Sequence, residues 1–202
     1  MINESYYWKK ELYENFKVVA RFIHLKKRID QSYVKLEKAI LLGAYIIRKL
    51  DEANKIPSDF LKRNERLNLF KGKGTVIDIL NSHQLDEHYN FNYNVEENRN
   101  WGFILNQLIH SYTLVYECDS KDGNGILLNS DNTSGSFLFH IPFELILKIF
   151  LSVSEGYLTS VAYERKKKNG KLIMKEATYT YPDGFSVSNE IANTMKGKIY
   201  NR

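Results

Sequence analysis

The sequence predicts an α+β protein, with a helical N-terminal half packed with a small antiparallel β-sheet and one crossing helix in the C-terminal half. Apolar residues recur at helical spacing through the first 50 positions. After residue 112, short β-rich runs alternate with clusters of turn-forming residues. We therefore expect a helical region at 1–111 and a strand-rich region at 112–202, with one continuous core as the alternative.

Composition excludes several classes of protein. With 202 residues and 43% hydrophobic content, the chain can build one domain or two small ones. The single cysteine, Cys118, excludes an internal disulfide. The longest apolar stretch, Ala39–Ile47, is about half of what a bilayer crossing needs. We expect a cytoplasmic protein with no membrane partner.

The net charge of +5 is concentrated in the N-terminal part of the sequence. Residues 1–70 hold 15 Lys and Arg against 9 Asp and Glu, whereas residues 71–202 hold 14 against 15. A basic segment suits phosphate groups or an acidic surface. The candidate partners are therefore RNA or another nucleic acid, and a partner protein.

Two helices are predicted to form a hairpin at the N-terminus. Glu4–Ile29 carries one apolar stripe, and Ser32–Ala53 is apolar nearly all round at its centre. Gly43 in that centre predicts a close helix crossing, because glycine otherwise weakens a helix by about 1 kcal/mol. A cationic ridge, for which solvation is the more common explanation, faces away from the stripe of the first helix; it contains Lys10, Lys17, Arg21, His24 and Arg28.

The segment after the hairpin is predicted to be irregular. A third short piece, opened by a proline at a helix-start position, is expected at Pro57–Leu69. A flexible link at Lys71–Gly74 precedes a short helix at Thr75–Ser82. Asp86–Asn98 is polar and rich in Asn, which predicts a loop.

The C-terminal half is predicted to hold the strands. An antiparallel meander is expected from three β-rich runs, at 113–118, 125–130 and 136–141. Pro142 opens a helix at Phe143–Ser154. Strands at 158–168 and 171–178 flank Asn169-Gly170, a strong hairpin signal because both turn positions need positive φ. A weak last helix is expected at 189–195.

One predicted helix, Asn98–Ser111, carries a candidate catalytic group. Arg99, Asn106 and His110 project from one side of it at 100° per residue. A histidine that acts as acid or base beside an amide could cleave RNA. The alternative is that Asn106 and His110 bind loop backbone where the helix meets the first strand.

The segment Asn106–Ser111 resembles the active helix of the HEPN superfamily, all-helical ribonucleases of bacterial toxin and antiviral defence systems. The resemblance covers this helix and, loosely, the preceding hairpin. It implies a metal-independent ribonuclease with His110 as the catalytic residue, working as a homodimer that brings two such helices together. HEPN enzymes place four to six residues between their Arg and His, whereas ten separate Arg99 from His110, about 16 Å along a helix. Arg99 and His110 therefore cannot pair within one protomer.

Two further segments are candidate sites. Five cations surround the predicted hairpin turn and could bind nucleic-acid phosphates, although they also suit a solvated tip: Arg165, Lys166, Lys167, Lys168 and Lys171. His83 and His88 are five positions apart, which a helix would splay, so we predict no metal site and no cofactor.

Two functional hypotheses follow. The first is a HEPN-like, RNA-associated defence or toxin protein; the second is a non-catalytic binding subunit of a larger protein or nucleic-acid complex. Only the first hypothesis makes the protein an enzyme, and both fit the sequence.

Overall fold

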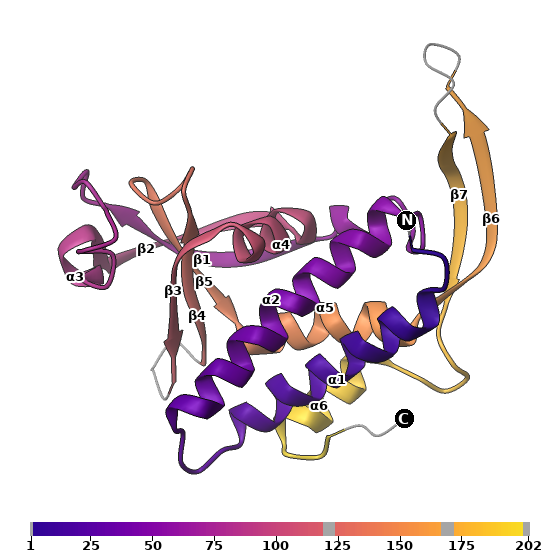
Figure 1. Cartoon of the computed structure of the whole chain (residues 1–202), viewed down its shortest axis with the longest axis horizontal. Coiled ribbons are helices and arrows are strands. Elements are labelled where there is room, and N and C mark those ends of the chain that lie inside the picture. The colour runs from indigo at the N-terminus through magenta and orange to yellow at the C-terminus, as the bar shows by residue number, and fades with distance from the viewer. Residues whose placement is uncertain (1, 119–123, 167–171, 200–202) are drawn as a thin grey trace. The chain divides into compact units, whose positions relative to one another are not determined.

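The computed structural model describes residues 2–118, 124–166 and 172–199 (Figure 1). It confirms the α+β class, with helices and antiparallel sheets in one chain. The chain divides into two compact units. We call Met1–Arg63 with Leu147–Arg202 the helical unit, and Asn64–Ile146 the sheet unit.

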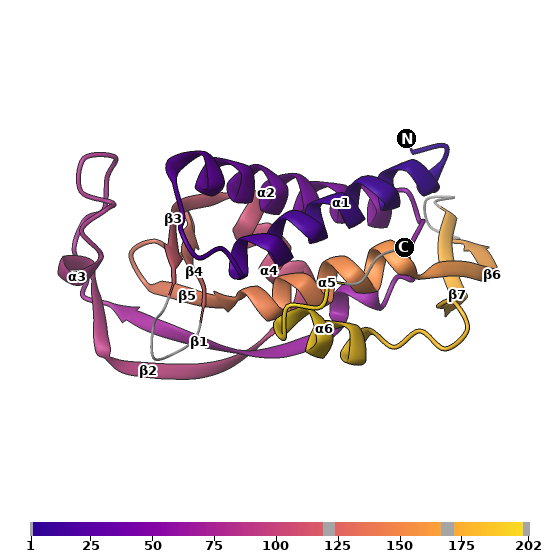
Figure 2. The same ribbon diagram turned by 90° about the horizontal axis from the view of Figure 1, so that it is seen from below.

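The helical unit is built on the predicted hairpin of α1 (Ser5–Ile23) and α2 (Asp30–Glu52), which lie side by side (Figure 2). Helix α1 begins after Glu4, whose carboxylate accepts a hydrogen bond from the Tyr6 backbone amide. Helix α2 begins after Ile29, where the Ser32 hydroxyl accepts from the Ile29 amide and donates to the Ile29 carbonyl. These caps bind backbone groups that a helix start leaves unpaired.

Helix α5 (Phe143–Glu155) crosses α2 at the predicted glycine. A Cβ atom on Gly43 would overlap the ring of Phe150, which is fully buried. Helix α5 therefore packs against α2 at Gly43, through the ring of Phe150. Helix α5 starts in the sheet unit, and its residues from Leu147 onward belong to the helical unit.

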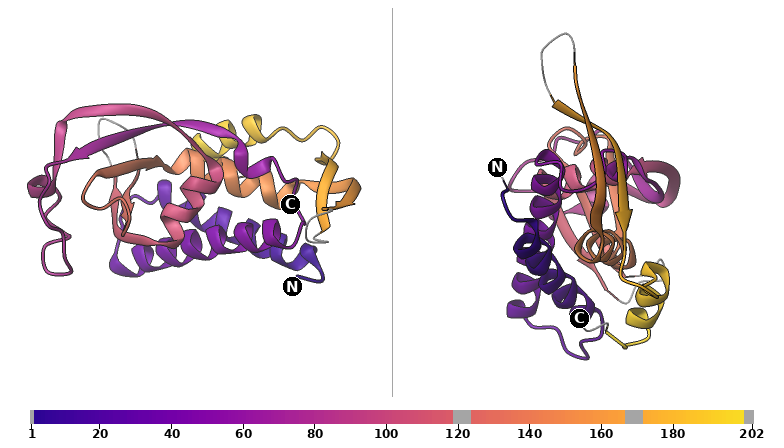
Figure 3. Two further views of the ribbon diagram at one scale, coloured as in Figure 1. Left: turned by 90° about the horizontal axis from the view of Figure 1, so that it is seen from above. Right: turned by 90° about the vertical axis from the view of Figure 1, so that its right-hand side faces the viewer.

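The rest of the helical unit consists of the 3₁₀ turn η1 (Phe60–Lys62), the paired strands β6 (Tyr157–Arg165) and β7 (Leu172–Thr180), and α6 (Val187–Met195). The predicted β-hairpin is confirmed by its antiparallel pairing, from Tyr157 opposite Thr180 to Arg165 opposite Leu172 (Figure 3). Its turn, Asn169-Gly170, lies outside the described residues.

The sheet unit contains five antiparallel strands in the order β2-β1-β5-β4-β3. The strands are β1 (Asn64–Gly72), β2 (Tyr89–Asn100), β3 (Ser111–Glu117), β4 (Gly125–Ser130) and β5 (Phe137–Pro142). The three strands of the predicted meander are confirmed as β3, β4 and β5. Helix α4 (Trp101–Ile109) contacts β4, and the one-turn helix α3 (Leu85–His88) precedes β2.

A buried polar network ties the sheet unit together around Tyr89. The Tyr89 hydroxyl donates to the Ser134 carbonyl and accepts from the Asn129 side-chain amide at 2.6 Å. The Asn129 side-chain oxygen in turn accepts from the backbone amide of Thr113 at 3.2 Å. Burial raises the pKa of Tyr89 to about 12, because the apolar surroundings disfavour the phenolate.

Three sequence predictions in this region were wrong. The segment 86–98 is mostly strand, because β2 pairs with β1 along its length while most of its side chains are exposed. Residues 75–82 form hydrogen-bonded turns around Asp78 instead of a helix. The piece at Pro57–Leu69 is η1 followed by β1, so the first half of the chain is less helical than predicted.

The two units do not follow the predicted boundary near residue 111. The helical unit is discontinuous in sequence, because α5, β6, β7 and α6 return to it after the sheet unit is complete. A change of secondary-structure type along the chain therefore does not mark a change of core. Within the described parts of the chain, every helix is too short or too polar to cross a membrane.

Candidate functional site

The three residues of the predicted catalytic group lie on two different elements. Arg99 lies in β2, Asn106 on α4, and His110 directly after α4. The prediction that Arg99 belongs to the same helical face was wrong: α4 begins only at Trp101, after the Asn100 side chain accepts from the Phe103 amide. All nine residues of α4, about 14 Å of helix, separate Arg99 from His110.

The surroundings of Arg99 indicate a structural role. Its guanidinium donates to the Glu97 carboxylate at 2.8 Å and stacks over the Phe103 ring, 4.6 Å from the centroid. Asn106 and His110 are both exposed. The structure therefore brings Asn106 and His110 to one end of α4 and leaves Arg99 at the other.

The basic hairpin is described only in part. Arg165 ends β6 and Lys166 follows it, both exposed. Lys167, Lys168 and Lys171 lie outside the described residues. Nucleic-acid binding by this hairpin stays a prediction.

His88 has a structural environment. It is buried, with Nδ1 2.7 Å from the Thr75 hydroxyl and Nε2 2.9 Å from the Asn81 carbonyl oxygen. Since a carbonyl only accepts, Nε2 donates to it and both ring nitrogens have partners. No group of three or more His, Cys, Asp and Glu suited to a metal occurs among the residues that the structure describes.

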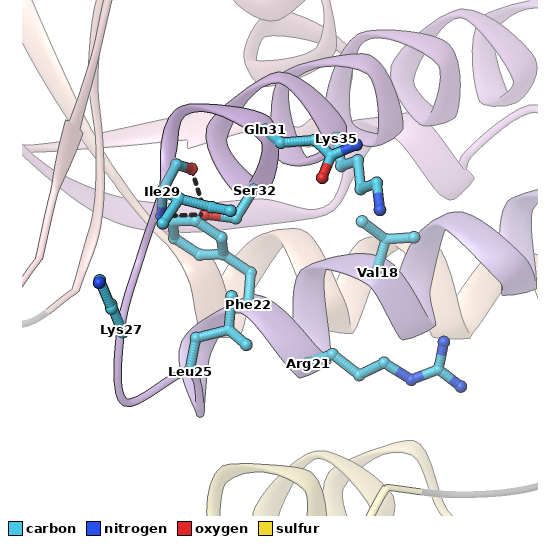
Figure 4. Close-up of a pocket in the computed structure, with 9 residues that line it drawn as sticks. All are labelled: Val18, Arg21, Phe22, Leu25, Lys27, Ile29, Gln31, Ser32 and Lys35. Carbon is cyan, nitrogen blue, oxygen red and sulfur yellow. Dashed lines mark hydrogen bonds between the residues drawn. The ribbon is translucent and has the colours of Figure 1, made fainter.

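A pocket of about 450 Å³ lies where α1 ends and α2 begins (Figure 4). This volume is within the range of about 300–1,000 Å³ typical of ligand sites. We call it the hairpin pocket. It is lined by Val18, Arg21, Phe22, Leu25, Lys27, Ile29, Gln31, Ser32 and Lys35.

The hairpin pocket has an apolar floor and a cationic rim. Phe22 is only 2% exposed, and its ring lies against Tyr33 in an edge-to-face contact. Leu25 and Ile29, in contrast, are 38% and 53% exposed, so they offer apolar surface that the described chain leaves open. Arg21, Lys27 and Lys35 bring three exposed cations to the same pocket.

Positive charge is concentrated around this pocket. Residues 17–38 contain seven Lys and Arg against two acidic residues, so this segment alone carries +5, which equals the net charge of the chain. The two units differ as well: the helical unit holds 24 Lys and Arg against 13 Asp and Glu, and the sheet unit holds 5 against 11. Their formal charges are therefore +11 and −6.

Sequence reasoning identified only part of this site. Arg21 belongs to the predicted cationic ridge, but that ridge is one face of a single helix. Lys27 and Lys35 were missed, because the pocket forms only when the end of α1 meets the start of α2. One sequence signal could have predicted the pocket. It is the run of cations that alternates with Val18, Phe22 and Leu25 and continues across the turn between the two predicted helices.

Comparisons with known proteins leave the family open. No family model matches the chain, and no curated protein or solved structure matches it.

Proposed function

We propose that the protein is a non-catalytic binding subunit, and that its hairpin pocket binds an acidic, amphipathic segment of a partner protein. The observation that carries this proposal is the combination of open apolar surface with three cations in one pocket. A peptide helix with aliphatic anchors and flanking carboxylates meets both requirements at once.

The apolar floor favours a protein segment over nucleic acid. Phosphate contacts need only cations, and bases need flat aromatic or guanidinium surfaces on which to stack. Among the lining residues only Arg21 offers such a surface, because the one aromatic side chain, Phe22, is buried; Leu25 and Ile29 supply open aliphatic surface. Aliphatic surface is stabilised by covering it with other aliphatic groups, at about 25 cal/mol per Å².

Selection from a random peptide library tests this. Displayed 16-residue peptides are selected on the wild-type protein and counterselected on a variant with Arg21→Glu, Lys27→Glu and Lys35→Glu. We expect the enriched peptides to carry Asp or Glu beside Leu, Ile or Phe at helical spacing. When synthesised, they should bind Leu25→Asp about tenfold or more weakly than the wild type, as for a buried apolar anchor.

A matched control distinguishes loss of the pocket from a general change in the charge of the protein. Lys10→Glu, Lys62→Glu and Lys175→Glu make the same charge change on exposed residues of the helical unit outside the pocket. This control should retain peptide binding. Equal loss of binding in both triple variants would contradict a specific pocket.

Binding of labelled single-stranded RNA tests the rival hypothesis, that the pocket binds nucleic acid. RNA binding that exceeds the best peptides, and that survives Leu25→Asp, would replace this proposal with nucleic-acid binding. The HEPN-like ribonuclease hypothesis also stays a prediction; Asn106 and His110 lie near the same end of α4, but Arg99 is engaged with Glu97.

A further inference from the structure

A loop of the sheet unit exposes an unusual amount of apolar surface. Residues Thr75–Ser82 connect β1 to α3 and project beyond the sheet (Figure 3). Within this loop Val76, Ile79 and Leu80 are 83%, 85% and 80% exposed. Single exposed apolar residues are ordinary, but three within five positions indicate an interaction surface. We call these three residues the apolar knob.

The loop holds the apolar knob in a defined conformation. The Asp78 carboxylate accepts from the backbone amides of Leu80 and Asn81, at 2.8 and 3.2 Å. The Asn81 side chain accepts from the Asp78 amide and donates to the Val76 carbonyl, at 2.8 and 3.0 Å. The buried His88 donates a hydrogen bond from Nε2 to the Asn81 carbonyl and so fixes the end of the loop. A preorganised loop loses less conformational entropy on binding than a disordered one.

We propose that the partner of the hairpin pocket is a second copy of this chain, which inserts its apolar knob. This inference rests on the proposed function and names its partner. The apolar knob supplies aliphatic side chains, and the pocket offers the aliphatic surface of Leu25 and Ile29.

The knob and the pocket are complementary in charge as well as in apolar surface. Residues 74–88, which carry the knob, contain Asp78, Asp86 and Glu87 and no Lys or Arg. The pocket rim carries Arg21, Lys27 and Lys35. On the scale of the units, a sheet unit of charge −6 approaches a helical unit of charge +11. Opposite charges speed association and fix the register of a contact.

The contact joins two different surfaces, so a single such contact between two copies is heterologous. In a pair joined by one such contact, one copy keeps an unused knob and the other keeps an unused pocket, and association continues into a ring or a filament unless a copy with one defective surface stops it. A symmetric dimer interface has no such property. This difference makes the inference testable with two variants.

The variants are Ile79→Asp, which destroys the knob, and Leu25→Asp, which destroys the pocket. Ile79 is 85% exposed and Leu25 is 38% exposed, so circular dichroism of each variant must first show the helix content of the wild type. By sedimentation velocity over a range of concentrations, the wild type should form dimers and larger species that raised salt weakens, since exposed charges are screened. Each variant alone should associate about tenfold or more weakly, as expected for loss of an interface anchor.

Mixing the two variants is the decisive measurement. Ile79→Asp retains a pocket and Leu25→Asp retains a knob, so the mixture should form a one-to-one dimer that grows no further. Val34→Asp, on an exposed residue of α2 outside the pocket, is the control and should associate like the wild type.

Three results would overturn the inference: a wild type that is monomeric at all concentrations, variants that associate like the wild type, or a mixture that stays monomeric. None of these affects the peptide selection, so the proposed function can stand while its partner changes. Enriched peptides that resemble residues 74–82 would support both.

Discussion

At the scale of single residues, Gly43 is a position in the helical unit where even a small added side chain should be destabilising. Gly43→Ala would normally stabilise a helix by about 1 kcal/mol. Here the added methyl group overlaps the buried ring of Phe150, so we expect a loss of about 1–3 kcal/mol in the free energy of unfolding, as for other overpacked cores. Urea denaturation followed by circular dichroism measures it.

Gly135→Ala is the control for this prediction. No atom lies within 4 Å of the Cβ position at Gly135, and this residue is exposed. It should change stability by less than Gly43→Ala does. A Gly43→Ala protein as stable as the wild type would show that α5 does not pack closely on α2.

Ionisation of Tyr89 should lower the free energy of unfolding at alkaline pH. In the unfolded chain a tyrosine ionises near its ordinary pKa of about 10. In the folded protein the pKa of Tyr89 is about 12, so the unfolded state loses its proton first. The contribution of Tyr89 is complete below pH 10, and we expect it to fall as the pH rises from about 10 to about 12.

Tyr89→Phe tests this through denaturation at several pH values. The variant should be less stable at neutral pH by about 1–3 kcal/mol, because the Asn129 amide and the Ser134 carbonyl lose a partner. Its stability should also decline less between pH 10 and 12. Tyr93→Phe, on an exposed residue of β2, should behave like the wild type; an equal decline in all three proteins would refute the role of Tyr89.

At the scale of elements, helix α4 decides between the two functional hypotheses. On the binding hypothesis, purified wild-type protein and His110→Ala degrade a mixed RNA pool equally little. RNA cleavage by the wild type that disappears in a folded His110→Ala variant would instead support the ribonuclease. Arg99→Ala separates the roles further, because the guanidinium holds Glu97 and Phe103 and its loss should lower stability.

The elements also explain what the sequence could and could not predict. The helix contact at Gly43 was predictable because glycine is unfavourable inside a helix, and the strands after residue 112 were predictable because β-rich runs alternate with turn residues. Strand β2 was not, because it lies at the sheet edge with most side chains exposed, and its backbone pairing with β1 leaves no mark on residue type. The hairpin pocket was missed for another reason: it belongs to the junction of two helices.

At the scale of the whole molecule, the sheet unit is one continuous segment and the helical unit is not. We expect residues 64–146, expressed alone, to fold. Trp101 reports it, since this side chain is 1% exposed and donates to Glu65 at 3.0 Å. Trp101 is the one tryptophan of this fragment, since Trp8 lies outside it, and its fluorescence should resist quenching by iodide. Quenching equal to that in urea would contradict independent folding.

The fragment 1–63 is the comparison for the fragment 64–146, because it is not a complete unit. They contain α1 and α2 but lack α5, whose Phe150 fills the space at Gly43. Expressed alone, this segment should be less helical than it is in the full chain and should bind a hydrophobic dye.

The discontinuity of the helical unit has a consequence for synthesis on the ribosome. Helices α1 and α2 are made first, but the part of α5 that belongs to the helical unit is added only after the sheet unit has been translated. At roughly 5–20 residues per second, this delay is on the order of ten seconds. During that time the apolar side of the nascent hairpin has no permanent cover. A chaperone at the exit tunnel therefore has its main opportunity before residue 147 emerges.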